Sequence, residues 1–334
     1  MSPTEEVVAV IMVHFLTPTT VERREPGELA ELLARDDGFV WLDLPMCDDA
    51  DGAMLREVFG CHPLAVQACQ QRNPVATMHS YPDHVFAVMH TPEPGEAGHV
   101  HLLELDVFVG RRYLVTVHGP LNPAVPPEAA LTETRAVLER IEHGRLRPKS
   151  PAEVSYAIAT AVARRQRTAI DVVARKIAAI EQRVMTSDFR NPEALLSEMF
   201  LIRHELLTVR TMAAQTHDLY ARMSHLMSGK DQALAEDLAD QFERVRNVGD
   251  GEKEFLLGVI DLYHSRVTTK MTVAMERLAV LAAVTLPVTA IASIYGMNII
   301  VNDNTRFVQL MLVIAVMTAI SVTLLRWTKK QGWW

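Results

Sequence analysis

The segment 278–294 reads LAVLAAVTLPVTAIASI, and it decides how the chain is built. No residue from 278 to 302 is charged, and the segment is about long enough to cross the hydrocarbon core of a bilayer as a helix. A second uncharged run, 307–325, follows. Two adjacent runs of this length favour two membrane spans over two buried helices of a soluble protein. The sequence therefore predicts a transmembrane helix hairpin at 277–326, with spans at about 278–297 and 307–325.

The charges beside the two spans predict their orientation. Arg326, Lys329 and Lys330 follow the second span, whereas the loop between the spans holds only Asp303 and Arg306. Because positive charge is retained on the cytosolic side, we expect the C-terminus in the cytosol. A hairpin places both ends on one side, so both termini are expected to be cytosolic. The chain is then a multi-pass protein of the cell membrane (plasma or inner membrane), ending in a basic cytosolic tail at 327–334.

Composition excludes some classes of partner. The net charge is -8, so the chain has no excess of positive charge that would neutralise the phosphates of a nucleic acid. We therefore expect no nucleic acid partner. The three cysteines, Cys47, Cys61 and Cys69, form no CxxC pair. An odd number of unpaired cysteines fits a reducing compartment better than a disulfide framework. The bulk of the chain is therefore expected to face the cytosol and the two spans to contact the lipid bilayer.

The region before the spans divides into two parts. Residues 1–145 alternate short β-rich runs with turns and helical stretches, which predicts a mixed cytosolic α/β domain. Residues 146–276 carry long amphipathic patterns and predict a helical stalk region. Within it, 151–227 is expected to form two antiparallel helices with a break near Asn191-Pro192. From about Asp231 the helical pattern runs into the first span, which would give one helix of about 100 Å. Such a helix suggests a funnel or stalk made of several copies.

The first span ends with Tyr295-Gly296-Met297-Asn298. At this place the chain resembles the CorA family of divalent-cation channels, whose signature is Gly-Met-Asn. The context agrees: Pro287 precedes the asparagine, and a short basic tail ends the chain. The segment GVIDLYHSRVTTKMTVAM at 258–275 and the turn FGCHPL at 59–64 match the family as well. The resemblance covers almost the whole chain, and it implies a homopentameric funnel that conducts hydrated Mg2+, with Co2+ or Ni2+ as other cargo, into the cytosol.

The asparagine also has a physical argument of its own. A ring of Asn298 carbonyls at the outer end of a helix on a symmetry axis would accept hydrogen bonds from the waters of a cation. Mg2+ releases its waters reluctantly, so neutral acceptors can select it as a hydrated ion. Gly296 would let the backbone approach closely. The alternative is that a glycine and an asparagine at a helix end form an ordinary C-terminal cap.

A stripe of side chains at three- and four-residue steps precedes this motif. Its cytosolic half is apolar and its outer half is small and polar. The resemblance implies that the apolar rings at Met275 and Leu278 form a gate that dewets on closing. It also implies that Thr289 is a polar position along the pore where a passing ion can bind. The alternative is that Met275 and Leu278 simply pack between helices. The resemblance also places Asp261 at the cytosolic mouth. The predicted pore residues are Asp261, Thr272, Met275, Leu278, Ala282, Leu286 and Thr289.

The regulatory site departs from the family pattern. The resemblance implies a cytosolic Mg2+ sensor between subunits, with Glu236, Asp237 and Asp240 on the long helix. On the opposing side Gln67-Ala68 replaces the usual Glu-Asp, and one carboxylate with water holds Mg2+ weakly. Three further departures are Thr272 in place of asparagine, Glu276 in place of lysine, and a loop without Met-Pro-Glu-Leu.

Two other readings stay open. The first is a zinc transporter of the ZntB type, with or without coupling to protons, which shares the two spans and a Gly-x-Asn ending. The second is a membrane-anchored sensor that has lost conduction. The sequence has no phosphate loop, so pumping driven by ATP has no visible machinery. It also has no catalytic triad or activated nucleophile, so we expect no enzymatic activity.

Overall fold

The computed structural model describes residues 11–186, 192–299 and 307–330, and the side chains in these ranges except those of 192, 295, 297–299 and 307–310. It divides the chain into two compact units, Met1–Leu257 and Gly258–Trp334. The division falls inside the segment 146–276 that the sequence assigns to the stalk. The first unit therefore contains the α/β domain together with most of the helices that follow it.

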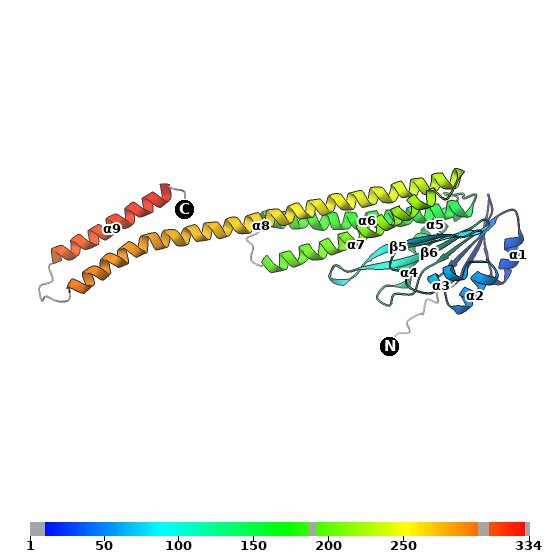
Figure 1. The fold of residues 1–334 in the computed structure, drawn as a ribbon, viewed down its shortest axis with the longest axis horizontal. Helices are drawn as coiled ribbons and strands as arrows, with labels where there is room; N and C mark the ends of the chain where they lie inside the picture. The colour runs from blue at the N-terminus through cyan, green and yellow to red at the C-terminus, as the bar shows by residue number, and fades with distance from the viewer. Residues whose placement is uncertain (1–10, 187–191, 300–306, 331–334) are drawn as a thin grey trace. The chain divides into compact units, whose positions relative to one another are not determined.

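A seven-stranded sheet forms the centre of the first unit (Figure 1). Its order is β2-β1-β3-β7-β6-β5-β4, and all neighbours are antiparallel except the central pair β3 and β7, which is parallel. The strands are β1 (Met12–Leu16), β2 (Val21–Arg24), β3 (Phe39–Leu44), β4 (Thr77–Ser80), β5 (His84–Pro94), β6 (Val100–Gly110) and β7 (Tyr113–Val117).

Helices cover both faces of this sheet. On one face lie α1 (Leu29–Ala34), α2 (Asp49–Glu57) and α3 (Pro63–Cys69), whose apolar side chains share a core with the strands. On the other face lie α5 (Thr132–Glu142), α6 (Pro151–Thr186), α7 (Pro192–Ser224) and the start of α8 (Gly229–Ile299). Short turns of helix complete the unit: η1 (Pro26–Glu28), η2 (Glu96–Gly98) and α4 (Pro127–Ala130).

Two cores explain the apolar composition of the central strands. Successive strand side chains point to opposite faces, so Leu114 enters one core while Val115 enters the other, and both are fully buried. All six residues of β3 are buried, as expected for a strand covered on both sides. Trp41 lies among them, and its indole Nε1 donates a 3.1 Å hydrogen bond to Thr116 Oγ1 of β7.

The helices agree with the sequence prediction. The two antiparallel helices expected in 151–227 are α6 and α7, and α7 begins at Pro192, a residue well suited to a first turn. The α8 helix continues through Gly249 and Gly251 without a break. Gly249 serves close packing: an added Cβ would lie 3.1 Å from Arg210 Cβ of α7. The guanidinium of Arg210 then bonds Asp250, with Nε 2.9 Å from Oδ1.

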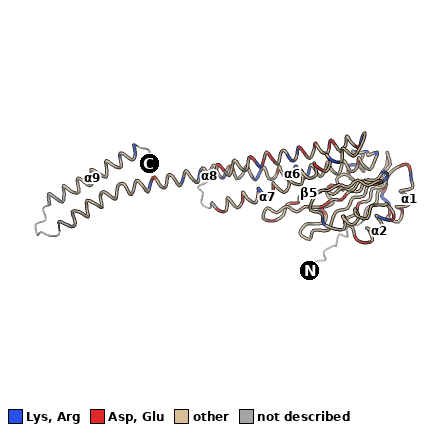
Figure 2. The backbone as a smooth tube through the Cα atoms, viewed as in Figure 1, with Lys and Arg blue, Asp and Glu red and all other residues tan. Residues whose placement is uncertain are grey.

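The second unit consists of the remainder of α8 and α9 (Phe307–Lys330). Both are long and apolar enough to cross a membrane. In the most apolar 18-residue stretch of each helix, only 6% (α8) and 11% (α9) is buried within the chain. Figure 2 shows the last part of α8 and most of α9 almost free of charged residues, with basic residues near the C-terminal end of α9. Side chains this apolar and this exposed need lipid or another protein surface to cover them.

Candidate functional site

The predicted pore residues lie on one exposed face of α8. Met275, Leu278 and Leu286 expose 61%, 65% and 67% of their surface, and Thr272, Ala282 and Thr289 are exposed as well. Steps of three and four residues keep all six on one stripe of a helix. The stripe predicted from the sequence is therefore present as a continuous surface that nothing within the chain covers.

The opposite face of α8 is less exposed. Val280 is 6% exposed, and the residues that follow it at helical spacing, Ala283, Pro287 and Ile291, are of intermediate exposure. On α9, Val313 is 7% exposed. The helix thus has an inner side, partly covered within the unit, and an outer side that carries the stripe. Within one chain, the partly covered side and the exposed stripe therefore lie on different sides of α8.

Hydroxyl groups of the apolar segment bond back to their own helix. Thr289 Oγ1 donates to the carbonyl of Thr285 at 2.8 Å, and Thr285 Oγ1 donates to the carbonyl of Leu281 at 2.8 Å. Thr272, nearer the start of the unit, makes the same contact with Thr268 at 3.0 Å. These bonds use each hydroxyl proton and leave the oxygen lone pairs free. Thr289 can therefore present an acceptor to a hydrated cation without an unsatisfied donor in an apolar setting.

Gly296 is a helical glycine with no packing role inside the chain. The helix runs on to Ile299, and Gly296 is not among the glycines with positive φ, which are Gly60, Gly98, Gly144 and Gly229. A glycine of a C-terminal cap adopts that left-handed conformation, so the cap interpretation is wrong for Gly296. Among the described residues, nothing lies within 4 Å of a Cβ added at Gly296. Glycine costs roughly 1 kcal/mol relative to alanine in a helix, and the described contacts give no packing reason for it.

The other two residues of the motif are partly described. Met297 and Asn298 belong to the last turn of α8, but their side chains lie outside the described residues, as do Asp303 and Arg306 of the loop. The backbone alone places the motif at the end of the first apolar helix. The entrance role of Asn298 remains a prediction.

Asp261 is exposed on α8 at the start of the second unit. Its neighbour Tyr263 is buried and makes an edge contact with His264, with ring centroids 5.8 Å apart. The carboxylate is thus available to solvent, while the next turn is held by packing. This arrangement is compatible with the cytosolic mouth expected for Asp261 and does not test it.

The three regulatory candidates lie on the part of α8 that belongs to the first unit, and all are exposed. Asp237 Oδ2 accepts two hydrogen bonds of 2.6 Å, from Tyr156 Oη of α6 and from Gln241 Nε2. Both bonds favour the carboxylate and lower the pKa of Asp237. Glu236 Oε1 accepts a 2.8 Å bond from Gln232. Asp237 is therefore already engaged within its own chain.

Sequence reasoning missed the partners of Asp237. Gln241 is four residues away on the same helix, a spacing at which side chains meet, so it could have been found. Tyr156 lies 81 residues earlier, and no local pattern connects it to Asp237. Only the packing of α6 beside α8 joins them.

The opposing positions lie on α3. Gln67 is exposed and Ala68 is half-buried, while the α3 side chains Ala65, Val66 and Cys69 are buried in the core. The helix thus presents Gln67 outward, as an interface position requires, but with an amide in place of a carboxylate. Among the described residues no group of three or more His, Cys, Asp or Glu side chains could hold a metal ion.

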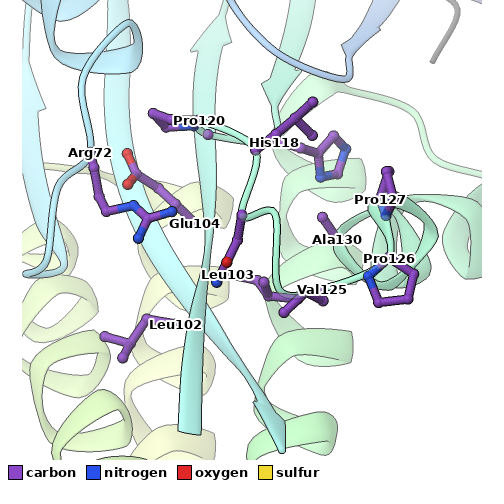
Figure 3. Close-up of a pocket in the computed structure, with 13 residues that line it drawn as sticks. Arg72, Leu102, Leu103, Glu104, His118, Pro120, Val125, Pro126, Pro127 and Ala130 are labelled. Carbon is purple, nitrogen blue, oxygen red and sulfur yellow. The ribbon is translucent and has the colours of Figure 1, made fainter. Parts of the chain in front are cut away.

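A small cavity lies in the α/β domain (Figure 3). It is lined by Arg72, Glu104, His118 and a proline-rich segment that includes Pro120 and Pro126. Its volume is about 20 Å³, room for about one water molecule. Glu104 is fixed at its edge, since Asn73 donates to both carboxyl oxygens, at 2.8 Å from the backbone nitrogen and 2.7 Å from Nδ2. A cavity of this size does not fit a nucleotide or metabolite.

Comparison with known proteins agrees with the fold. Residues 36–330 match the family described as CorA-like Mg2+ transporter protein. The Bacillus subtilis protein YfjQ, whose name assigns it to metal ion transport, is 24% identical over 338 residues, covering 98% of each chain. The cobalt/magnesium transport protein CorA of Thermotoga maritima is 22% identical over 289 residues, covering 83% of this chain and 78% of that protein.

The solved structures include a full-length match. The complete CorA magnesium transporter of Methanocaldococcus jannaschii superposes with a TM-score of 0.78 at 14% identity, covering 100% of both chains. That match extends through the soluble domain, the long helix and the two apolar C-terminal helices. The class defined by this fold is a two-span membrane transport protein with a large N-terminal α/β domain. The chain belongs to the CorA-like Mg2+ transporter family, a family of metal ion transporters and channels, not of enzymes.

Proposed function

We propose that this protein conducts hydrated divalent cations, with Mg2+ as the principal ion and Co2+ or Ni2+ as further cargo. The ions pass into the cytosol through a pore lined by the stripe on α8. Gly296, Met297 and Asn298 form its outer entrance, Met275 and Leu278 its apolar gate, and Asp261 its cytosolic mouth. The transported cation also regulates closure from the cytosol, at the acids on α8.

The observation that carries this proposal is the uncovered stripe. A transmembrane helix that faced only lipid would gain nothing from Thr289 on its outer side or from Gly296 near its end. Copies of the chain arranged with these stripes inward would bring the small and polar residues around a common axis. Gly296, which has open space around it in one chain, would then let neighbouring backbones approach the axis.

The chemistry of the stripe suits a hydrated ion. Thr289 offers a hydroxyl oxygen and Asn298 an amide oxygen, and neither is charged. Neutral acceptors can bond to the water shell of Mg2+ without removing it, which matters because Mg2+ dehydrates reluctantly. The transmembrane potential supplies the inward driving force. No ATP-dependent step is required.

The pore requires an oligomer. One hairpin contributes two helices, and two helices cannot enclose a polar path through lipid. A closed ring of identical subunits around the α8 axis satisfies this requirement, and a homopentamer is the arrangement that the family resemblance implies. Both termini face the cytosol across the cell membrane, consistent with Arg326, Lys329 and Lys330 at the end of α9.

Ion uptake into liposomes tests the proposal. The purified protein is reconstituted, and uptake of Mg2+, Co2+ and Zn2+ is compared while internal pH is recorded. Rapid Mg2+ uptake that follows the imposed potential, without a change in internal pH, is the expected result. Zinc uptake coupled to protons would establish the ZntB-like alternative. No flux of any of the three ions would establish a non-conducting sensor.

A further inference from the structure

Two backbone amides at the start of α3 donate to imidazole nitrogens. The N–H of His62 donates to His84 Nε2 at 3.4 Å, and the N–H of Leu64 donates to His62 Nδ1 at 3.2 Å. Pro63, between them, has no N–H. Ala65 and Val66 donate to the carbonyl of His62 at 2.9 and 3.1 Å. The first turn of α3 is therefore held by two imidazoles and one carbonyl.

These contacts assign an acceptor role to one nitrogen of each ring. A backbone amide can only donate, so the nitrogen that receives it must carry a lone pair and no proton. With Nε2 as an acceptor, His84 is neutral in this arrangement. In neutral His84 the ring proton sits on Nδ1, which is buried and has no hydrogen-bond partner among the described residues. The closed arrangement thus offers no acceptor to a charged His84.

The surroundings keep the two rings in place. Tyr81 stacks on both of them, with centroid distances of 4.4 Å to His62 and 4.9 Å to His84. The other titratable groups near the pair are His79 on β4, Asp83 in the turn before β5, and Cys61 and Tyr113 on the buried side. Burial raises the pKa of Cys61 and of Tyr113, so both are neutral in this pH range. Asp83 is the single carboxylate in this set.

We propose that His84 forms an acid-sensitive latch that holds the start of α3 at neutral pH and releases it on protonation. His84 takes up one proton at Nε2, the nitrogen that now accepts the amide of His62. The amide and the new ring N–H then face each other as two donors, and this hydrogen bond is lost. The helix start is freed while its inner side chains, Ala65 and Val66, remain the contact with the core.

The direction of the pH dependence follows from burial. Burial lowers the pKa of His84 and the nearby His62 lowers it further, while Asp83 opposes the shift. A histidine whose folded pKa lies below its ordinary 6.5 stabilises the folded arrangement above that value. The stabilisation is lost as the pH falls through the folded pKa. A charged imidazole also gains from the face of Tyr81, but that contact does not restore an acceptor for the amides.

The latch acts on the outward face of α3. That face carries Leu64, which is 65% exposed, and Gln67. Acid would therefore release the start of α3 and so alter its outward face. This is the face that carries Gln67 of the Gln67-Ala68 pair, which replaces the carboxylates of the family pattern. The inference depends only on contacts within the first unit and does not rest on conduction.

Hydrogen exchange on the full-length protein in lipid nanodiscs tests the latch. Peptides that cover 61–69 are compared at pH 7.5 and 5.0 after correction for the intrinsic exchange rate. Protection there should fall by up to about tenfold for each pH unit between the ordinary imidazole pKa of 6.5 and the lower folded pKa of His84, while peptides from β6 in the same sample keep theirs. Equal protection of 61–69 at both pH values would overturn the proposal.

Variants separate the latch from general acid effects. His62→Asp with His84→Gln retains acceptors at both places, and the side chains do not titrate between pH 5 and 8. This double variant should stay protected at pH 5.0. His79→Gln, the matched control, removes a neighbouring histidine whose ring makes neither backbone contact, and it should behave like the unmodified protein. The same loss of protection in the double variant would place the acid response elsewhere, such as at His14 or His90, and refute the latch.

A measurement on the unmodified protein covers the case in which the double variant does not fold. Nitrogen NMR of the labelled imidazoles reports which ring nitrogen carries the proton. At pH 7.5 the proton of His84 is expected on Nδ1, and protonation of its Nε2 should coincide with the loss of protection. A proton on His84 Nε2 at pH 7.5 would contradict the latch directly.

Discussion

Tyr156 Oη lies 2.6 Å from Asp237 Oδ2, so that α6 and α8 are joined at the carboxylate that the sequence assigns to cation sensing. A carboxylate with two hydrogen bonds on one oxygen can still bind a cation through its other oxygen. To bind the cation with both oxygens, it must lose or share those two hydrogen bonds. Together with Gln67 and Ala68 on α3, this contact suggests a regulatory interface that binds Mg2+ weakly.

Restoring the missing carboxylates should strengthen closure. We predict that Gln67→Glu with Ala68→Asp lowers the internal Mg2+ needed for half-closure by about tenfold, within the range of ordinary coupling free energies. Asp237→Ala should weaken whatever inhibition the protein has. Current against internal Mg2+ for the three proteins measures this. Coincident curves would show that this interface does not sense the ion.

Removing the Tyr156 hydroxyl should release Asp237. In Tyr156→Phe the pKa of Asp237 should rise toward its ordinary value, because one of the two bonds that lower it is gone. Asp237 is exposed, so the loss of stability should be only about 0.5–1 kcal/mol. Thermal unfolding and carboxyl NMR titration measure the two effects. Asp240→Asn is the matched control, and an equal change there would argue against a specific role for Tyr156.

The entrance prediction concerns Asn298. Asn298→Ala should reduce cation uptake by at least about tenfold, since a lost hydrogen bond to a charged group costs about 1.5–3 kcal/mol and every subunit loses one. Mass in detergent should stay that of the intact oligomer. Leu312→Ala, on an exposed position of α9, is the control. Unchanged uptake in Asn298→Ala would remove this residue from the site, and a stable monomer in detergent would refute the pore itself.

Water access distinguishes the pore stripe from a lipid-facing surface. Cys47, Cys61 and Cys69 are all buried, so the unmodified protein should react little with a charged thiol reagent. Cysteines introduced as Leu286→Cys or Thr289→Cys should be modified from water when the pore is open. Val316→Cys, exposed on α9, should be protected by lipid. Equal modification at 289 and 316 would contradict the assignment of the stripe to a pore.

The α/β domain contains a buried carboxylate, Asp43, that should set its acid stability. His118 Nε2 lies 2.9 Å from Asp43 Oδ1, and Thr116 also bonds this carboxylate. Burial raises the pKa of Asp43, but the charge and hydrogen bond of His118 and the bonds of Thr116 and Thr134 outweigh it and lower the pKa below 3.8. The stabilisation is therefore present above that pH and lost as the pH falls through the folded value.

We predict that Asp43→Asn destabilises the domain by about 2 kcal/mol at pH 7, because the amide cannot replace the buried carboxylate as the acceptor of its hydrogen bonds. The difference from the unmodified protein should shrink below pH 4. Thermal unfolding followed by near-UV circular dichroism at several pH values tests this. Asp36→Asn, in an exposed pair with Arg112, should change stability by less than about 0.5 kcal/mol. A pH-independent difference for Asp43→Asn would exclude the loss of the carboxylate as its cause.

Much of the fold could be predicted because the pattern of hydrophobic residues specifies its helices. This holds for the two apolar runs, for the α6 and α7 pair and for the long α8. Each of them has a period or a length that only a helix satisfies. The strands β2 and β4 carry little sequence pattern because each has four residues, with polar side chains at the edge of the sheet, such as Arg23 and His79. The parallel pairing of β3 with β7 joins residues more than seventy positions apart, and single-strand patterns do not encode partners.

The candidate site was predicted only where it follows helical spacing. The stripe on α8 could be read from the sequence because residues three and four apart share a face. The contact of Tyr156 with Asp237 and the bonds of His62 with His84 depend on tertiary packing. The motif FGCHPL was expected as a turn, and the structure adds that its histidine caps α3.

The parallel seam between β3 and β7 also sets an order of events during synthesis. Until residue 117 has left the ribosome, strands β1 to β3 have no partner on that side, so the sheet is complete only when β7 arrives. The apolar helices are translated more than 150 residues later. The sheet can therefore close around β7 before the spans are translated. Insertion into the membrane then begins from a chain whose N-terminal part is already folded, and the first span emerges as the continuation of a helix that this folded part has already started.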